Sequence, residues 1–260
     1  MHSLIYIGFL GLFAGTVTLE IHHLMPPSLK FLQGTTYIVY SFTLELATIA
    51  YLTGLFWALA RRLIGTEYRI KTKTTIDDYL TLSLLIFIGI SGITTEAGRI
   101  ALENFPDYEK WSFIGYAVGQ FLNLSNPELF HRVSWVLHVV SFFVFLIAIP
   151  LSKLRHIFTS PINMFMSPKE RPKGAMKFIG NLLEADDIDN VGTEIIDHFT
   201  WKQLMDLDAC TVCGRCTSVC PANQTGKSLD PREIILKVGQ VMSESGQPAV
   251  PATVSTPGPL

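Results

Sequence analysis

The sequence contains little cysteine, and all of it lies in one place. Its four cysteines fall between positions 210 and 220, so none remains to form a disulfide elsewhere in the 260 residues. This distribution excludes the disulfide framework of a small secreted domain. Closely spaced reduced cysteines are instead typical of the cytoplasm, where we expect this part of the chain to lie.

Charge is scarce as well. Charged residues make up 16% of the chain, the net charge is −2, and 48% of the residues are hydrophobic. The charge balance gives no reason to expect a nucleic-acid partner. The composition is too apolar for an ordinary soluble protein, and the apolar residues concentrate before Leu151. No basic segment precedes the first apolar run, so we predict no cleavable signal peptide.

Four apolar stretches are long enough to cross a bilayer, which takes about 20 residues. We predict membrane spans at residues 3–24, 35–60, 78–102 and 128–151. A further apolar stretch, residues 111–124, is too short to span, and we expect an interfacial or re-entrant helix with Trp111 and Tyr116 at headgroup depth. Gly8, Gly11 and Gly15 lie inside the first span, where small residues permit close helix packing.

Basic residues indicate the orientation of these spans. Lys and Arg number five between positions 61 and 73 and six between positions 153 and 177, on one side of the predicted membrane. The opposite side has only Lys30, Arg99, Lys110 and Arg132, diluted by acidic residues. The positive-inside rule therefore places both termini in the cytoplasm, in the cell inner (plasma) membrane. This agrees with the argument from the cysteines.

The cysteines follow the spacing Cys-x2-Cys-x2-Cys-x3-Cys-Pro, by which bacterial ferredoxins hold an iron–sulfur cluster. Gly214 gives the loop freedom to curl, and Pro221 turns the chain away after the last cysteine. Zinc is the alternative, but structural zinc sites usually pair two separated cysteine arms or include histidine. We predict that a 4Fe-4S cluster is bound by Cys210, Cys213, Cys216 and Cys220. A short helix is expected before them, over residues 199–207, and another after them, with Asp230 as its N-cap.

The chain has seven histidines, and most lie on the first and fourth spans or near their ends: His2, His22, His23, His131, His138, His156 and His198. At 1.5 Å per residue, the helix from residue 2 to residue 23 would be about 31 Å long, and that from residue 138 to residue 156 about 27 Å. On antiparallel helices this spacing would pair His2 with His156 near the cytoplasm. It would also pair His23 with His138 near the outer face. Such pairs could hold two b haems in the bundle core.

Other interpretations of the histidines stay open. His22 and His23 could be interfacial residues, and His156 could belong to a basic flank. His131 lies on the same helical face as His138 and could replace it as a ligand or line a quinone pocket, and His22 could replace His23.

Among the ionisable residues of the predicted spans, Glu45 lies in the middle of the second, and Glu96 and Arg99 lie in the third. Such groups cost about 2.5–3.5 kcal/mol each on insertion scales and normally have a function or a partner. Glu96 and Arg99, with His131, are possible quinone or haem-propionate contacts. The alternative is an internal pair in which Arg99 satisfies Glu96 one turn away.

The chain resembles the membrane segment shared by nitrate reductase gamma subunits and the cytochrome b parts of heterodisulfide-reductase-like proteins. The resemblance rests on His131-x6-His138, Pro150-x-Ser152-Lys153-x2-His156 and Ser160-Pro161-x-Asn163. It implies that His138 and His156 ligate two b haems and, less directly, that His2 and His23 are their partners.

The second part of the chain resembles the ferredoxin module of the same fused proteins. The segments that carry this likeness are residues 199–210 and 226–232. These proteins include membrane-bound electron-transfer flavoprotein:menaquinone oxidoreductases, which implies electron-transfer flavoprotein as donor and menaquinone as acceptor. The family normally continues with a second cysteine run, which this sequence lacks before Leu260. Cys220 therefore either completes a single cluster or belongs to a second one, and we expect a truncated chain or a split subunit.

Together these features predict an all-α protein: a four-transmembrane-helix dihaem cytochrome b bundle followed by a small α-helical ferredoxin-like module. The expected division is a cytochrome b domain (1–156), a polar linker (157–198), the 4Fe-4S module (199–242) and a disordered tail or linker (243–260). The predicted function is quinone-linked electron transfer. One alternative is the membrane subunit of a heterodisulfide-reductase-like or sulfite-reduction-linked complex. The other is a haem-free membrane anchor whose cluster is structural or senses redox state.

Overall fold

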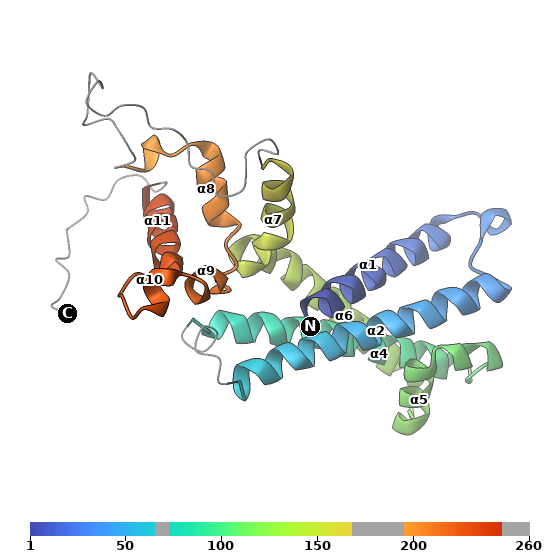
Figure 1. Ribbon diagram of the computed structural model, residues 1–260. Helices are drawn as coiled ribbons and strands as arrows, with labels where there is room; N and C mark the ends of the chain where they lie inside the picture. The colour runs from blue at the N-terminus through green and yellow to red at the C-terminus, as the bar shows by residue number, and fades with distance from the viewer. Residues whose placement is uncertain (66–72, 168–194, 246–260) are drawn as a thin grey trace, which may run out of the picture. The chain divides into compact units, whose positions relative to one another are not determined.

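The computed structural model describes residues 1–65, 73–167 and 195–245, and within these ranges the chain is helical and contains no strand (Figure 1). It forms two compact units, Met1–Ser152 and Lys153–Leu260. Several residues used above lie outside the described ranges: the basic residues at 69, 71 and 169–177, and most of the predicted tail. The all-α prediction is confirmed.

The first unit contains four helices long and apolar enough to cross a membrane: α1 (His2–Leu24), α2 (Gly34–Leu63), α4 (Ile76–Leu102) and α6 (Pro127–Leu151). They confirm the four predicted spans. A 3-10 turn, η2 (Asp107–Trp111), and the short helix α5 (Phe113–Leu122) lie between α4 and α6. At ten residues, α5 is too short to span, as predicted.

Local signals in the sequence explain where the spans begin. Thr75 and Asp78 form a capping box at the start of α4, where the Thr75 N–H donates to Asp78 Oδ2 at 2.9 Å. At the start of α6 the Asn126 side chain accepts the Leu129 N–H at 3.0 Å, and Pro127 occupies the first helical position. Each cap satisfies an N–H group that has no partner inside its own helix.

Small residues and one tyrosine hold the spans together. The most extensive interfaces in the first unit are α4 with α6 and α1 with α2. A Cβ atom on Gly8 would lie 2.7 Å from the backbone nitrogen of Tyr51, so α1 and α2 meet backbone to backbone, as the glycines predicted. Tyr51 is 1% exposed, and its hydroxyl donates to the Leu85 carbonyl at 3.0 Å. The ring of Phe9 lies between those of Tyr51 and Phe145, which brings α6 into the core.

The second unit consists of short helices around the cysteine loop: α7 (His156–Phe165), α8 (Trp201–Asp208), α9 (Arg215–Ser218), α10 (Pro221–Gln224) and α11 (Pro231–Ser245). Helix α8 begins with a capping box formed by Thr200 and Gln203. Asp230 caps α11 as predicted, since its Oδ1 accepts the Arg232 N–H at 2.9 Å. Helix α7 occupies the start of the segment expected to be a polar linker, and the two units divide at Ser152, before His156.

The backbone contact at Gly8 predicts a specific sensitivity. Gly8→Ala should destabilise the first unit by about 1–3 kcal/mol, because the added methyl group meets backbone atoms that cannot move aside. Thermal unfolding in detergent measures this as a lower midpoint. Gly239→Ala in α11 is the matched control, because its new methyl group would lie 4.0 Å from Leu207 Cβ, its nearest neighbour outside its own helix, which is an ordinary van der Waals contact. An unchanged midpoint for Gly8→Ala would contradict the close packing of α1 on α2.

Candidate functional site

The cysteine loop is shaped by two residues in the left-handed region, Val212 (φ 57°) and Gly214 (φ 71°). Gly214 precedes α9, so it supplies the turn that the sequence assigned to it. Pro221 is the first residue of α10 and directs the chain away from Cys220. The far side of the loop is fixed to α11, because the Thr217 hydroxyl donates to Asp230 Oδ1 at 2.5 Å.

All four cysteines are free thiols, and each is at least partly accessible. Four soft sulfur donors within eleven residues suit an iron–sulfur cluster, and no disulfide competes for them. In the described part of the chain, no three His, Cys, Asp or Glu side chains converge as a metal site would require. The donor set thus fits the predicted cluster, while the four side chains are not gathered about one point.

Two histidines of α6 face α4. His131 Nδ1 lies 3.0 Å from the carbonyl of Thr95, and because a carbonyl only accepts, this nitrogen carries the proton. His138 Nδ1 lies 3.0 Å from Ser91 Oγ, whose own proton goes to the Ile88 carbonyl, so His138 also donates through Nδ1. A neutral imidazole in this state has its lone pair on Nε2. Metal-ligating histidines are commonly oriented in this way.

The remaining predicted ligands differ from one another. His156 Nδ1 lies 2.6 Å from the Lys153 carbonyl, so it too carries the proton on Nδ1. His22 shows the opposite pattern, since its Nδ1 accepts the Leu32 N–H at 3.1 Å and its edge meets Phe31. His22 therefore fixes the connection after α1. The side chains of His2 and His23 are exposed at the two ends of α1. His156 belongs to the second unit, so its pairing with His2 stays a prediction.

Two carboxylates meet the N-terminus of α5. Glu45 of α2 is 3% exposed, and its Oε1 accepts the N–H groups of Ile114 and Gly115 at 3.1 and 3.3 Å. A carboxylate at this position satisfies orphan helix donors and complements the helix dipole. Glu96 of α4 approaches the same turn, where a Cβ atom on Gly115 would lie 2.7 Å from Glu96 Oε2. Gly115 therefore allows both carboxylates to reach the start of α5.

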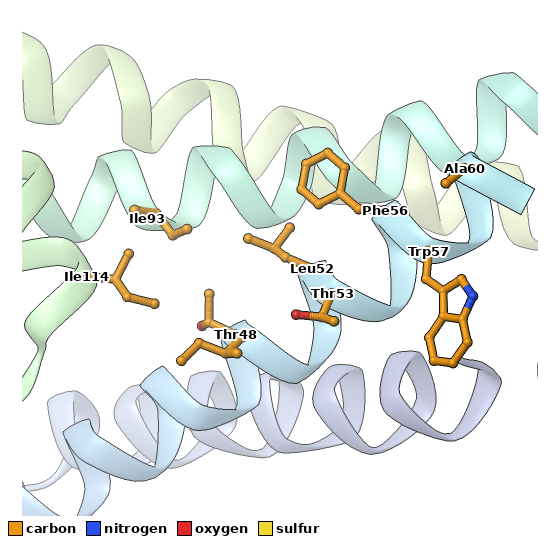
Figure 2. Close-up of a pocket in the computed structure, with 9 residues that line it drawn as sticks. Thr48, Leu52, Thr53, Phe56, Trp57, Ala60, Ile93 and Ile114 are labelled. Carbon is orange, nitrogen blue, oxygen red and sulfur yellow. The ribbon is translucent and has the colours of Figure 1, made fainter. Parts of the chain in front are cut away.

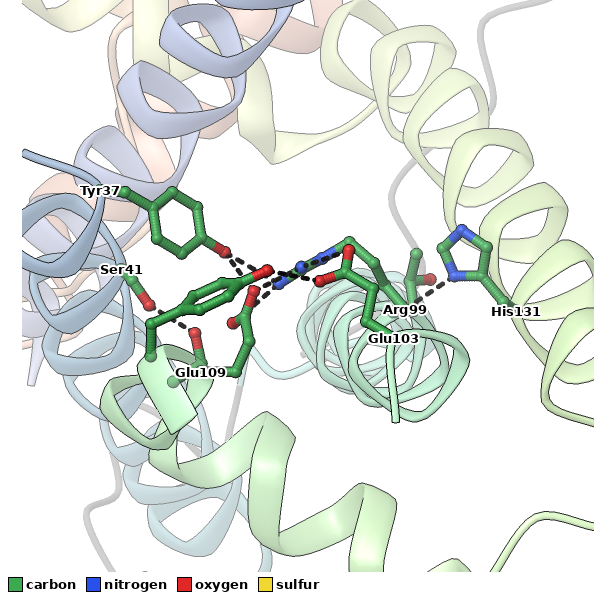
Figure 3. Close-up of polar contacts among 9 residues, drawn as sticks. Tyr37, Ser41, Arg99, Glu103, Glu109 and His131 are labelled. Carbon is green, nitrogen blue, oxygen red and sulfur yellow. Dashed lines mark hydrogen bonds and ion pairs between the residues drawn. The ribbon is translucent and has the colours of Figure 1, made fainter. Parts of the chain in front are cut away.

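Arg99 forms a polar network with residues far away in the sequence (Figure 3). Its guanidinium binds both carboxylate oxygens of Glu109, at 2.6 and 3.1 Å, and donates to the Tyr37 hydroxyl at 3.1 Å. The Tyr37 hydroxyl in turn donates to Glu109 at 2.7 Å. Glu109 is 0% exposed. Burial alone would raise the pKa of Glu109, but the donors on Arg99 and Tyr37 outweigh it and hold the pKa below its usual value.

This network gives Arg99 a partner that neither interpretation of the sequence named. Arg99 pairs with Glu109 and, more weakly, with Glu103 at 3.4 Å, rather than with Glu96. The three residues predicted to contact a quinone or propionates are also not brought to one place. Figure 3 shows Arg99 on the side of α4 that faces α2, whereas His131 meets α4 from the opposite side.

An apolar groove of about 640 Å³ lies along α2 (Figure 2). Leu52, Phe56 and Trp57 line it from α2. Ile93 of α4 and Ile114 of α5 close one end, beside the turn that Glu45 caps. The groove is therefore almost entirely apolar, and Ile114, whose N–H group Glu45 accepts, lines it.

Several of these residues could not be recognised from the sequence. Glu109 looks like one more acid in an outer loop, and Tyr37 like an interfacial tyrosine. Ser91 resembles any small residue in a span, although it orients His138. The only available signal was the unpaired charge of Arg99, which required some partner inside the protein.

Comparison with known families identifies both parts of the chain. The nitrate reductase gamma subunit family matches residues 3–171, and a 4Fe-4S binding domain matches residues 201–222. No solved structure matches the chain significantly.

Three curated proteins are similar to the chain. EtfAB:quinone oxidoreductase of Syntrophomonas wolfei is 29% identical over 91% of this chain and 34% of its own length. The probable iron-sulfur-binding oxidoreductase FadF of Bacillus subtilis is 30% identical over 95% of this chain and 34% of its own. A probable membrane-anchored ferredoxin of Chromohalobacter salexigens is 45% identical over 23% of this chain and 9% of its own. The chain spans about a third of the length of the first two.

The buried ion pair predicts a large effect of Arg99→Leu. Without Arg99 the Glu109 carboxylate is buried with neutral donors only, which should lower the free energy of unfolding by about 3 kcal/mol or more. Arg132→Leu is the matched control, because its pair with Glu128 is exposed and worth less than about 1 kcal/mol. Thermal unfolding in detergent compares the two. Equal midpoints for both variants would contradict the network.

The same pair predicts a pH dependence. The pKa of Glu109 is lowered in the folded protein. The stability that its charged carboxylate contributes is therefore fully present above the ordinary pKa of 4.5, and it is lost as the pH falls through the lower pKa of the folded state. The wild type should therefore lose stability at acid pH more steeply than Glu109→Gln, which carries no titrating group there. Unfolding midpoints between neutral and acid pH test this. Parallel curves for the two proteins would show that Glu109 contributes nothing.

Proposed function

Since the chain belongs to the nitrate reductase gamma subunit family and continues into a 4Fe-4S binding domain, we propose that it carries electrons between a cytoplasmic donor and membrane quinone. The single observation behind this proposal is the combination of four apolar spans, histidines that face the bundle interior, and a four-cysteine loop in one chain. The relative from Syntrophomonas, named for a quinone and for EtfAB, supports this choice. Electron-transfer flavoprotein is accordingly the proposed donor and menaquinone the proposed acceptor.

The cysteine loop would hold the cluster through Cys210, Cys213, Cys216 and Cys220. A bound cluster supplies reversible one-electron chemistry, and the protein sets its orientation and potential. The four cysteines are accessible, which suits electron exchange with a soluble donor protein, because the donor must come close to the cluster. The excess of basic residues beside the second and fourth spans supports placing this loop, and both termini, on the cytoplasmic side.

The histidines would hold b haem within the spans. His138 and His156 carry the proton on Nδ1, which leaves Nε2 for iron, and Ser91 and the Lys153 carbonyl fix their rings. His131 has the same arrangement and remains a rival to His138. At the C-terminal end of α1, the bond from the Leu32 N–H to His22 Nδ1 leaves the proton of a neutral His22 on Nε2, the nitrogen that would bind iron. This favours His23 as the ligand. We propose two haems, one near each membrane face.

Quinone reduction needs two electrons and two protons. We propose that the quinone binds in the groove along α2. Its apolar wall suits an isoprenoid chain, and Glu45 and Glu96 beside Ile114 could pass protons to the ring oxygens. Arg99 is less suited to this role than the sequence suggested, because Glu109 and Tyr37 already bind its guanidinium.

The haem assignment is tested by substitution at individual histidines. His138→Ala should remove one haem from the purified protein and leave the iron–sulfur signal intact. His22→Ala should retain both haems, because this side chain bonds the backbone of Leu32. The reduced-minus-oxidised optical spectrum quantifies haem, and electron paramagnetic resonance reports the cluster. Retention of both haems in His138→Ala, with loss in His131→Ala, would transfer the ligand role to His131.

The donor and acceptor are tested together. Protein in vesicles that contain menaquinone should oxidise reduced electron-transfer flavoprotein and form quinol. Reduced dithiols are the comparison, because a heterodisulfide-reductase-like protein would use them instead. The second half of the reaction, electron transfer from haem to quinone, is measured as oxidation of the haem when a quinone analogue is added. Haem reduction by dithiols alone would contradict the proposed donor.

A further inference from the structure

Two sequence patterns that lie far apart in the chain meet in the second unit. One is Ser160-Pro161-x-Asn163 on α7, and the other includes Lys202 on α8. Asn163 Nδ2 donates to Asp206 Oδ1 at 2.9 Å, and Lys202 Nζ donates to Asn163 Oδ1 at 2.5 Å. Lys202 also binds Asp206 at 2.6 Å. The three side chains therefore form a closed triangle between the two helices.

A second set of contacts joins α7 to the end of α8. The Ser160 hydroxyl donates to the Ala209 carbonyl at 3.3 Å. The Thr159 hydroxyl lies 3.4 Å from the Asp208 carbonyl, although the Arg155 carbonyl of its own helix, at 3.2 Å, is its nearer acceptor. Arg155 adds an ion pair with Asp208 at 3.6 Å. The last carbonyls of a helix have no partner within it, so α7 satisfies groups that α8 leaves open.

The position of these contacts in the chain suggests why they matter. Ala209 immediately precedes Cys210, and Ser160 lies one turn after His156. One hydrogen bond therefore connects the helix that begins with His156 to the residue before the first cysteine. The contacts between α7 and α8 fix these two segments against each other within one compact unit.

We propose that Ser160, Asn163 and Lys202 are positioning residues, which hold Cys210 at a fixed separation from His156 and so set the rate of electron transfer between them. This inference rests on the proposed function, in which Cys210 binds the cluster and His156 a haem. In the step concerned, one electron leaves the reduced cluster and one ferric haem is reduced, and no proton moves. None of the three side chains needs to contact either cofactor.

The test uses the purified full chain in detergent, mixed anaerobically with reduced methyl viologen while the haem absorbance is followed. A Cys213→Ser protein, which lacks the intact cluster, gives the rate of direct haem reduction. Ser160→Ala combined with Asn163→Ala should slow the cluster-dependent reduction by roughly tenfold or more, because placement errors of about 1 Å are costly in such sites. Haem content, cluster line shape and both midpoint potentials should stay unchanged.

Control variants separate positioning from general damage. Ser167→Ala removes a hydroxyl at the end of α7 that bonds only the Asn163 carbonyl, and it should leave the rate unchanged. Lys202→Met should slow the reaction, whereas Lys202→Arg should restore it. Amide hydrogen exchange at residues 207–213 should accelerate in the slow variants and not in Ser167→Ala.

The outcomes distinguish this inference from the proposed function. If the wild type reduces its haem no faster than Cys213→Ser, the proposed electron path fails. If the wild type is faster but the Ser160→Ala/Asn163→Ala double variant and Lys202→Met match it, the positioning role is overturned. Loss of haem or cluster from every variant would also overturn it, because these residues would then be required for folding rather than placement.

Discussion

Polar groups inside a bilayer must find partners within the protein, and this constraint organises the first unit. Helix α4 satisfies this constraint with three sets of contacts. Its Arg99 binds Glu109 and Tyr37, its Ser91 and the Thr95 carbonyl bind the histidines of α6, and its Glu96 approaches the start of α5. Together these contacts join α4 to α2, η2, α5 and α6. The helix therefore both holds the bundle together and orients the side chains that suit cofactor binding.

The sequence was sufficient for the features that depend on composition and spacing. The four spans followed from the length of the apolar runs, and the cysteine loop from its pattern together with Gly214 and Pro221. The start of α11 at Asp230 followed from its capping signal. These features are local, so neighbouring residues determine them.

Features that depend on contacts between distant segments could not be predicted in the same way. The partner of Arg99 is Glu109, ten residues away across a turn, rather than Glu96 on the adjacent helical turn. The structural role of His22 depends on its bond from the Leu32 N–H, which forms only when the chain reverses after α1. Most of α7 was expected to be linker, because Pro161 and the Pro, Lys and Asp residues that follow the helix in the sequence are untypical of a helix. The contacts of α7 with α8 could not be seen from these local signals.

The chain combines a bundle of four apolar helices, whose histidines suit haem binding, with a four-cysteine loop that suits an iron–sulfur cluster. We propose that this one chain carries both cofactors. A redox titration of the purified full chain, followed by optical and electron paramagnetic resonance spectra together, tests this most directly. We predict a b-type haem band and an iron–sulfur signal that each titrate reversibly. A cluster-loaded protein without a haem band would contradict the account and indicate a membrane anchor instead.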